Sequence, residues 1–337
     1  MKERSVYAVT VLFLMSALLF PKTSFAAPAS YYDGKVITII VGYAPGGMYD
    51  RIARVVAKNL PKHIPGKPSV IVQNMPGGSS MIAANHLYNK ADPDGLTILA
   101  TTRSIVFMQI LKAEGIKYDV NKFGWLGSAS RDSILLLVRS DLPYKTMDEL
   151  LKSKKRFFLG VTGPADITSQ VTNIMKDYIL PSVEVVQYRS GTEVFLAIER
   201  KEVDGVWGAY NTARPYIENG LVRPLCRARV SLKGIEHLPV NEDFATDPMA
   251  KAILGMLGRT GEMGTLYLLP PGTPANVMKI LREAFEKTLK DPELQADAQK
   301  ALLQLTYVPE EECSKLVQYL FSQPPEVLKV LDKYVKF

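Results

Sequence analysis

The segment from residue 35 to residue 60 constrains the fold most, because it predicts a strand, a glycine turn and a helix in succession. Residues 36–41 form a β-branched run without polar alternation, which is typical of a parallel strand covered on both faces. After a turn that contains Gly46 and Gly47, apolar side chains recur at helical spacing up to Leu60. The segment therefore predicts one unit of an α/β fold.

The glycine turn has the chemistry of an anion site. Gly46 and Gly47 lack a Cβ atom, so a ligand can approach the backbone closely, and the amides that start the helix carry the positive end of the peptide dipoles. The same dipole favours Asp50 in the first helical turn. This geometry suits a carboxylate or phosphate, and the alternative is a turn that only connects the strand to the helix. The turn matches neither of the common glycine-rich nucleotide motifs, so nucleotide binding is not supported.

Strands and helices alternate along the rest of the chain, which favours an α/β fold with a mainly parallel sheet. The last helix is expected from about Pro309. Further strands are expected at residues 69–72, 97–100, 126–129, 134–138, 157–161, 183–186, 205–209, 222–225 and 265–269.

Residues 1–26 have the pattern of a secretory signal peptide. Lys2 and Arg4 precede an apolar run, residues 6–20, and the small residues Ser24 and Ala26, which flank Phe25, precede the expected cleavage point. A membrane anchor is the alternative, but the run is shorter than the roughly 20 residues that a span requires. We therefore predict cleavage after Ala26 and export.

Charge and cysteine content argue against several classes of partner and site. Residues 1–26 carry +2 of the formal net charge of +7, which leaves a mildly basic mature chain near +5. No dense basic tract is interleaved with aromatic residues, so a nucleic-acid partner is not expected. Cys226 and Cys313 lack the C-x-x-C spacing of zinc and redox sites; free thiols are the default, and a disulfide after export is the alternative.

The sequence offers no catalytic constellation. His63, His86 and His237 lie in three separate segments, and the common metalloprotease and serine-hydrolase motifs are absent. We expect no catalytic residue, no metal site and no cofactor.

Seven motifs, in order, resemble the substrate-binding proteins of tripartite tricarboxylate transporters, also called the Bug or TctC family. They are APGG with Asp50 (44–50), QNMPGG (73–78), DPDGLTILATT (92–102), VTGPADITS (161–169), YRSGTE (188–193), EVDGVWGA (202–209) and LLPPGTP (268–274).

The resemblance implies a periplasmic binding protein of the type II, Venus-flytrap kind, with a ligand cleft between two α/β domains. Domain 1 would comprise residues 28–127 and 257–337, and domain 2 residues 128–256. Such a protein would act as a monomer, capture a small organic carboxylate without converting it, and deliver it to the membrane permease subunits of the transporter.

The resemblance also implies site residues. Backbone amides of two βα loops would hold the ligand's proximal carboxylate, and two further loops would shape the pocket. The first pair of loops contains Ala44, Pro45, Gly46, Gly47, Thr162, Gly163, Ala165 and Thr168. The further loops contain Thr101, Thr102, Tyr188, Ser190 and Gly191. Tyr43 and Asp50 flank the first loop and complete the candidate set.

Departures from the commoner family pattern suggest the kind of acid. Met48 and Tyr49 stand where many relatives have Ser or Thr, and Trp207 begins a stretch that lacks a carboxylate present in many relatives. An amino-acid ligand is therefore disfavoured. We predict a dicarboxylate or an aromatic acid, with Met48, Tyr49, Trp207 and Tyr210 as apolar surface and Arg103 facing a second acid group. For Trp207 the alternative is a place in the core of a buried strand.

Two other classes of function remain open. The flytrap architecture also serves ATP-driven importers and sensor inputs, which neighbouring permease genes would distinguish. An exported α/β hydrolase is disfavoured by the absence of triad spacing, and turnover of a bound acid would support it.

Overall fold

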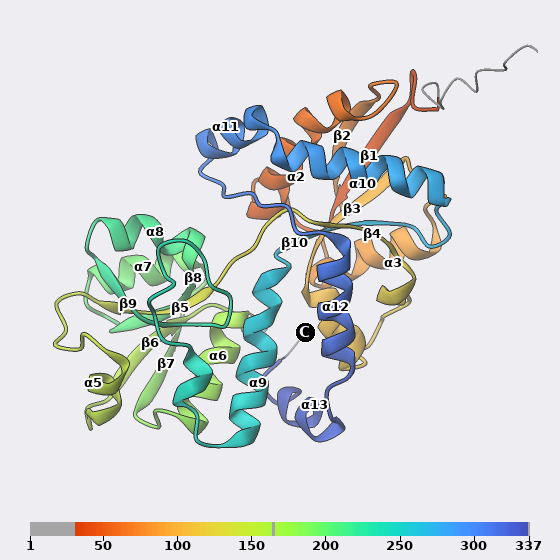
Figure 1. Cartoon of the computed structure of the whole chain (residues 1–337). Coiled ribbons are helices and arrows are strands. Elements are labelled where there is room, and N and C mark those ends of the chain that lie inside the picture. The colour runs from red at the N-terminus through yellow and green to blue at the C-terminus, as the bar shows by residue number, and fades with distance from the viewer. Residues whose placement is uncertain (1–30, 164–165, 336–337) are drawn as a thin grey trace, which may run out of the picture.

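The computed structural model describes residues 31–163 and 166–335 and folds them into two α/β domains, which Figure 1 shows side by side. The predicted two-domain α/β architecture is confirmed. The predicted signal peptide, residues 1–26, lies outside the described residues. Nowhere in the described ranges is a helix both long and apolar enough to cross a bilayer.

Each domain is built on one five-stranded sheet, and the two sheets have the same pattern. The sheet of domain 1 has the order β2 (Ser69–Asn74), β1 (Val36–Val41), β3 (Thr97–Thr102), β10 (Thr265–Leu269), β4 (Gly124–Ser128). The sheet of domain 2 has the order β7 (Val183–Gln187), β6 (Phe157–Val161), β8 (Gly205–Ala209), β5 (Ile134–Arg139), β9 (Val222–Arg227).

Both sheets are mixed rather than mainly parallel. In each sheet three strands pair in parallel, and the fourth pairs antiparallel with both of its neighbours: β10 with β3 and β4 in domain 1, β5 with β8 and β9 in domain 2. The antiparallel strands β10 and β5 are the ones by which the chain enters a domain from the other one, which explains the reversed direction. Two crossovers, residues 129–133 and 260–264, join the domains.

Helices cover both faces of each sheet, as the apolar strand at residues 36–41 predicted. Domain 1 carries α2 (Met48–Asn59), α3 (Met81–Asn89), α4 (Ser104–Ile110), α10 (Ala275–Lys290), α11 (Pro292–Lys300) and α12 (Glu310–Phe321). Domain 2 carries α5 (Met147–Lys152), α6 (Ile167–Tyr178), α7 (Gly191–Glu199), α8 (Tyr210–Glu218) and α9 (Pro248–Arg259). Helix α9 runs through position 256, where the sequence-based domain boundary was placed.

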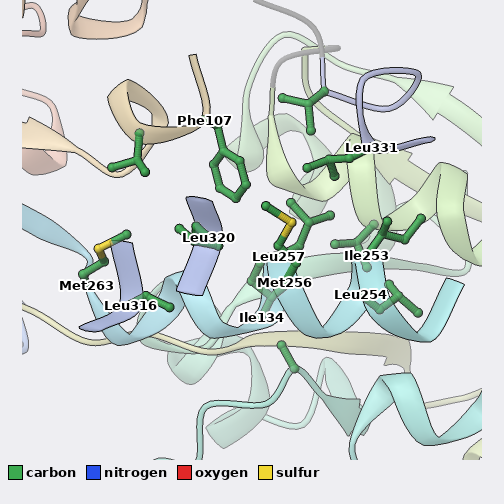
Figure 2. Close-up of a cluster of buried hydrophobic side chains, with 14 of the residues drawn as sticks. Phe107, Ile134, Ile253, Leu254, Met256, Leu257, Met263, Leu316, Leu320 and Leu331 are labelled. Atoms are coloured by element: carbon green, nitrogen blue, oxygen red, sulfur yellow. The ribbon is translucent and has the colours of Figure 1, made fainter. Parts of the chain in front are cut away.

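One buried cluster extends from domain 1 into domain 2. Figure 2 shows Phe107 of α4 and Leu320 of α12 close to Leu257 of α9. Leu331 joins the same cluster from a further helix, α13 (Pro325–Leu331). A helix begins at Pro309 as predicted, since Pro309 is the N-cap of α12, but the prediction that it is the last helix was wrong. Pro325 is a favourable first helical residue and starts α13 after a short break.

Cys226 and Cys313 are buried and free, which confirms the prediction of two free thiols. Burial raises the pKa of each thiol to about 12, so both are inert at neutral pH.

Candidate functional site

A cavity of about 460 Å³ lies between the two domains. It is lined by Tyr43, Tyr49, Ser79, Thr102, Arg103, Ser104 and Phe107 from domain 1, by Thr162, Gly163, Asp166, Ile167, Gln170 and Arg189 from domain 2, and by Val335 near the C-terminus. Its volume is within the range of small-molecule sites. Most of the lining side chains are polar, and two are arginines.

The loop between β1 and α2 contributes Tyr43 to one wall of the cavity, and Asp50 braces this loop from behind. Asp50 is only 2% exposed. Its Oδ2 accepts hydrogen bonds from the Gly46 amide at 2.8 Å and Arg54 Nε at 2.9 Å, and its Oδ1 accepts from Asn74 Nδ2 at 3.0 Å. Burial alone would raise the pKa of Asp50, but these hydrogen bonds outweigh burial and lower it. The Gly46 amide, predicted to bind ligand, is thus already engaged by the protein's own carboxylate.

The start of α2 keeps the features of an anion site. Gly47 is the N-cap and supplies no side-chain hydrogen bond, so no cap side chain satisfies the first amides of the helix. Residues 44–48 are exposed, and Gly46 has a φ of 85°, which glycine adopts without strain. An acid at this helix start would meet amides of Met48 and Tyr49.

Two tyrosines form an aromatic surface beside that loop. The rings of Tyr43 and Tyr49 stack with centroids 4.6 Å apart and an interplanar angle of 12°. Burial and the neighbouring Tyr49 raise the pKa of Tyr43, so its phenol is neutral at physiological pH. The pair offers the cavity a flat apolar face with a hydroxyl edge.

A left-handed loop supports the same wall. Residues 77–80 all have positive φ, including the two serines Ser79 at 48° and Ser80 at 78°. Buried Ser80 shares a hydrogen bond of 2.6 Å with Thr101 and approaches Gly42 so closely that a Cβ atom there would overlap its hydroxyl. This strained backbone places Ser79 on the cavity. Thr101 is therefore a support of the loop, whereas Thr102 lines the cavity.

Arg103 is the residue that precedes α4 at the carboxyl end of β3, and it lines the cavity. Within the described part of the chain its guanidinium makes no ion pair. Burial raises the pKa of Asp132, in the crossover at residues 129–133, to about 6. The positive charge of Arg103 acts in the opposite direction and lowers the pKa of that carboxyl.

The loop between β6 and α6 forms the facing wall in domain 2. Asp166 is the N-cap of α6 and accepts hydrogen bonds from the Thr162 hydroxyl at 2.6 Å and the Thr168 amide at 3.1 Å. The Thr162 and Thr168 hydroxyl oxygens are 3.4 Å apart. The wall formed by domain 2 therefore presents the Asp166 carboxylate to the cavity. Ala165, also a predicted ligand contact, lies outside the described residues.

Several predicted site residues are not among those that line the cavity. Trp207 is 1% exposed and its Nε1 donates to Met175 Sδ at 3.4 Å, so the core alternative describes its position. Tyr210 donates to the Lys233 carbonyl, and Tyr188 to Glu202. Ala44, Pro45, Gly46, Gly47, Met48, Asp50, Thr101, Thr168, Ser190 and Gly191 are close in sequence to lining residues but do not line the cavity.

Sequence reasoning missed other lining residues. Asp166 and Arg189 lie inside quoted motifs, so the capping position of Asp166 and the charge of Arg189 could have identified them. The others are Ser79, Ser104, Phe107, Ile167, Gln170 and Val335. No local sequence pattern marks Val335 as a site residue, because its position depends on how the end of the chain packs. In the described ranges no group of three His, Cys, Asp or Glu side chains is arranged for a metal ion.

Comparisons with known proteins identify the family of the chain. A family model described as "Tripartite tricarboxylate transporter family receptor" (TctC) matches residues 52–331. A UPF0065 protein of Bordetella pertussis is 25% identical over 274 residues, which cover 80% of each chain.

Solved structures share the fold. The chain resembles a TctC solute-binding protein from Polaromonas without ligand, with a TM-score of 0.71, 19% identity, and coverage of 90% of this chain and 99% of that one. It also resembles an R. palustris protein solved with adipate, with a TM-score of 0.62, 20% identity, and coverage of 88% and 97%.

Proposed function

The chain belongs to the tripartite tricarboxylate transporter receptor family, whose members are periplasmic solute-binding proteins, and from that premise we propose that it captures a small organic carboxylate between its two domains. The observation that carries this proposal is the interdomain cavity with Arg103 on one wall and Arg189 on the other. Two cations from opposite domains favour an anionic ligand that contacts both.

We assign roles to the groups on each wall. Amides at the start of α2 hold one carboxylate, since Asp50 keeps the loop in place but leaves that helix start without a side-chain cap. Arg103 faces a second acid group, and the stacked Tyr43 and Tyr49 rings contact the body of the ligand. Adipate, the ligand of a structural relative, has this combination of two acid groups and an apolar body.

Capture requires that the closed form gains contacts that the open form lacks. A ligand that touches both walls supplies these contacts. It shifts the population toward the closed form only by the difference between its affinities for the closed and open forms. We propose that the exported, mature chain acts as a monomer and that the closed form delivers its cargo to the membrane permease subunits of the transporter. In this role the protein converts no substrate and requires no cofactor.

A thermal-shift screen over mono-, di- and tricarboxylates tests the proposal. A ligand present at 100 times its Kd stabilises the folded protein by about 2.7 kcal/mol, which raises the melting temperature measurably. Titration calorimetry with Arg103→Ala then tests the assigned role, with the exposed Arg156→Ala as a control of equal charge change. We expect at least tenfold weaker binding of diacids for Arg103→Ala only. Unchanged affinities for every bound acid would contradict the role of Arg103.

A further inference from the structure

The end of the chain connects the two domains a third time. Helix α12 packs on β4 and α4 of domain 1, where Leu320 lies close to Phe107 in Figure 2. After a break at residues 322–324, α13 packs on α9 of domain 2. Residues 325–335, which we call the C-terminal segment, therefore follow domain 1 in sequence but contact domain 2.

A specific hydrogen bond fixes the C-terminal segment to domain 2. The Tyr334 hydroxyl donates to Asp177 Oδ2 of α6 at 2.6 Å. Burial and this hydrogen bond raise the pKa of Tyr334, so the phenol keeps its proton at physiological pH. The bond lies one residue before Val335, which is 3% exposed and lines the ligand cavity.

Val335 completes an apolar part of the cavity wall. Three lining side chains are purely hydrocarbon: Phe107 of domain 1, Ile167 of domain 2 and Val335. Phe107 and Val335 belong to one buried cluster, and Ile167 packs against it. Each of the three comes from a different part of the chain, so the apolar surface is complete only when the C-terminal segment is docked.

We propose that the C-terminal segment is a wall of the ligand site that moves with domain 2, and that Val335 selects the length of the ligand's hydrocarbon body. The proposal rests on the proposed capture of a carboxylate. A methylene transferred from water to an apolar surface gains about fourfold in affinity. A change of volume at Val335 therefore alters the relative affinity for acids that differ in chain length.

Titration calorimetry with straight-chain α,ω-dicarboxylates of four to eight carbons tests the selection. We expect Val335→Ala to shift the ratio of affinities toward longer acids by three- to tenfold. Lys333→Ala, an exposed neighbour on the same segment, is the matched control and should keep the wild-type ratios. Identical ratios in wild type and Val335→Ala would overturn the selection by Val335.

A second measurement tests the role of the C-terminal segment without depending on which ligand binds. Spin labels on Lys90→Cys and Lys154→Cys, exposed positions in domains 1 and 2, report the distance between the domains, and both native thiols are buried. Tyr334→Phe removes the bond to Asp177, so we expect a broader distance distribution in the ligand-free protein than with Lys333→Ala. An unchanged distance distribution would overturn the proposal that the C-terminal segment moves with domain 2. If the wild type binds no acid at all, the proposed carboxylate function fails, and the spin-label result still decides the role of the segment.

Discussion

The two domains present similar loops to the interdomain cavity but place the acidic residue of each loop differently. In domain 1 the sequence runs from strand to glycine turn to helix, and Asp50 lies inside the helix, buried behind the loop. In domain 2 the corresponding carboxylate, Asp166, is the N-cap of the helix and lies on the cavity. Both carboxylates accept hydrogen bonds from their own loop or helix, but Asp50 is buried behind its loop whereas Asp166 lines the cavity.

This difference assigns affinity for an acid to the wall of domain 1 and selectivity among acids to the wall of domain 2. The loop of domain 1 has its negative charge neutralised by Arg54 and hydrogen bonds, so this wall attracts an anion through amides and Arg103. The loop of domain 2 offers Asp166 next to Thr162 and Arg189, so an acid that approaches this wall meets charges of both signs. The same substitution, Asp to Asn, should therefore have opposite effects on binding in the two loops.

The largest effect is expected for Asp50→Asn. The amide keeps one acceptor oxygen, but its NH₂ group must face either the Asn74 amide or the Gly46 and Arg54 donors. We expect the free energy of unfolding at pH 7 to fall by about 3 kcal/mol, and diacid affinity to fall at least tenfold. Urea denaturation and calorimetry measure the two quantities. A stable variant with wild-type affinity would show that the brace is dispensable.

The crossover carboxylate Asp132 sharpens the comparison, because it is partly buried and has fewer hydrogen-bond partners than Asp50. Its Oδ1 accepts from the Ser133 amide at 2.8 Å and the Asn211 amide at 3.3 Å, and its pKa is raised to about 6. The unfolded value is about 3.9, so the folded state binds more protons and loses stability as the pH rises from 4 to 6.

Asp132→Asn keeps the Oδ1 acceptor and removes this titration. We therefore expect the variant to be about 2 kcal/mol more stable than wild type at pH 7, with the difference vanishing below pH 4. Denaturation curves over this pH range measure it. A pH-independent difference would mean that Asp132 does not titrate in this range.

Gly46→Ala tests the geometry of the domain 1 loop. No atom would lie within 4 Å of the new Cβ atom, so the cost comes from the φ of 85° alone, about 1 kcal/mol. Gly47→Ala is the matched control, since Gly47 has a φ of −71° and only the Ala44 carbonyl 3.7 Å away. Equal melting temperatures for the two variants would exclude the left-handed turn.

Asp166→Asn is expected to change stability least. Asparagine is as good an N-cap as aspartate, so the unfolding free energy should stay within about 0.5 kcal/mol. Removal of a negative charge from the cavity should tighten diacid binding two- to fivefold, measured by calorimetry, in contrast to the loss with Asp50→Asn. Weaker binding would show that Asp166 accepts a hydrogen bond from the ligand.

The local sequence predicted the strands and the two main loops, because periodicity and turn residues determine them. It could not say that the Asp50 carboxylate turns back to the Gly46 amide, since that depends on Asn74, which a different strand supplies. Nor could it place Val335, whose position follows from the packing of α13 on α9. Trp207 shows the opposite case: a resemblance suggested ligand contact, whereas the buried strand around it favoured the core.

A crystal structure of the complex with the tightest-binding acid tests the central claim most directly. The account predicts the acid between the domains, with one carboxylate at the Met48 and Tyr49 amides, the second group near Arg103, further contacts from the Thr162 loop, and Asp50 still bonded to the Gly46 amide. An acid bound outside the cleft, or one that contacts a single domain, would contradict it.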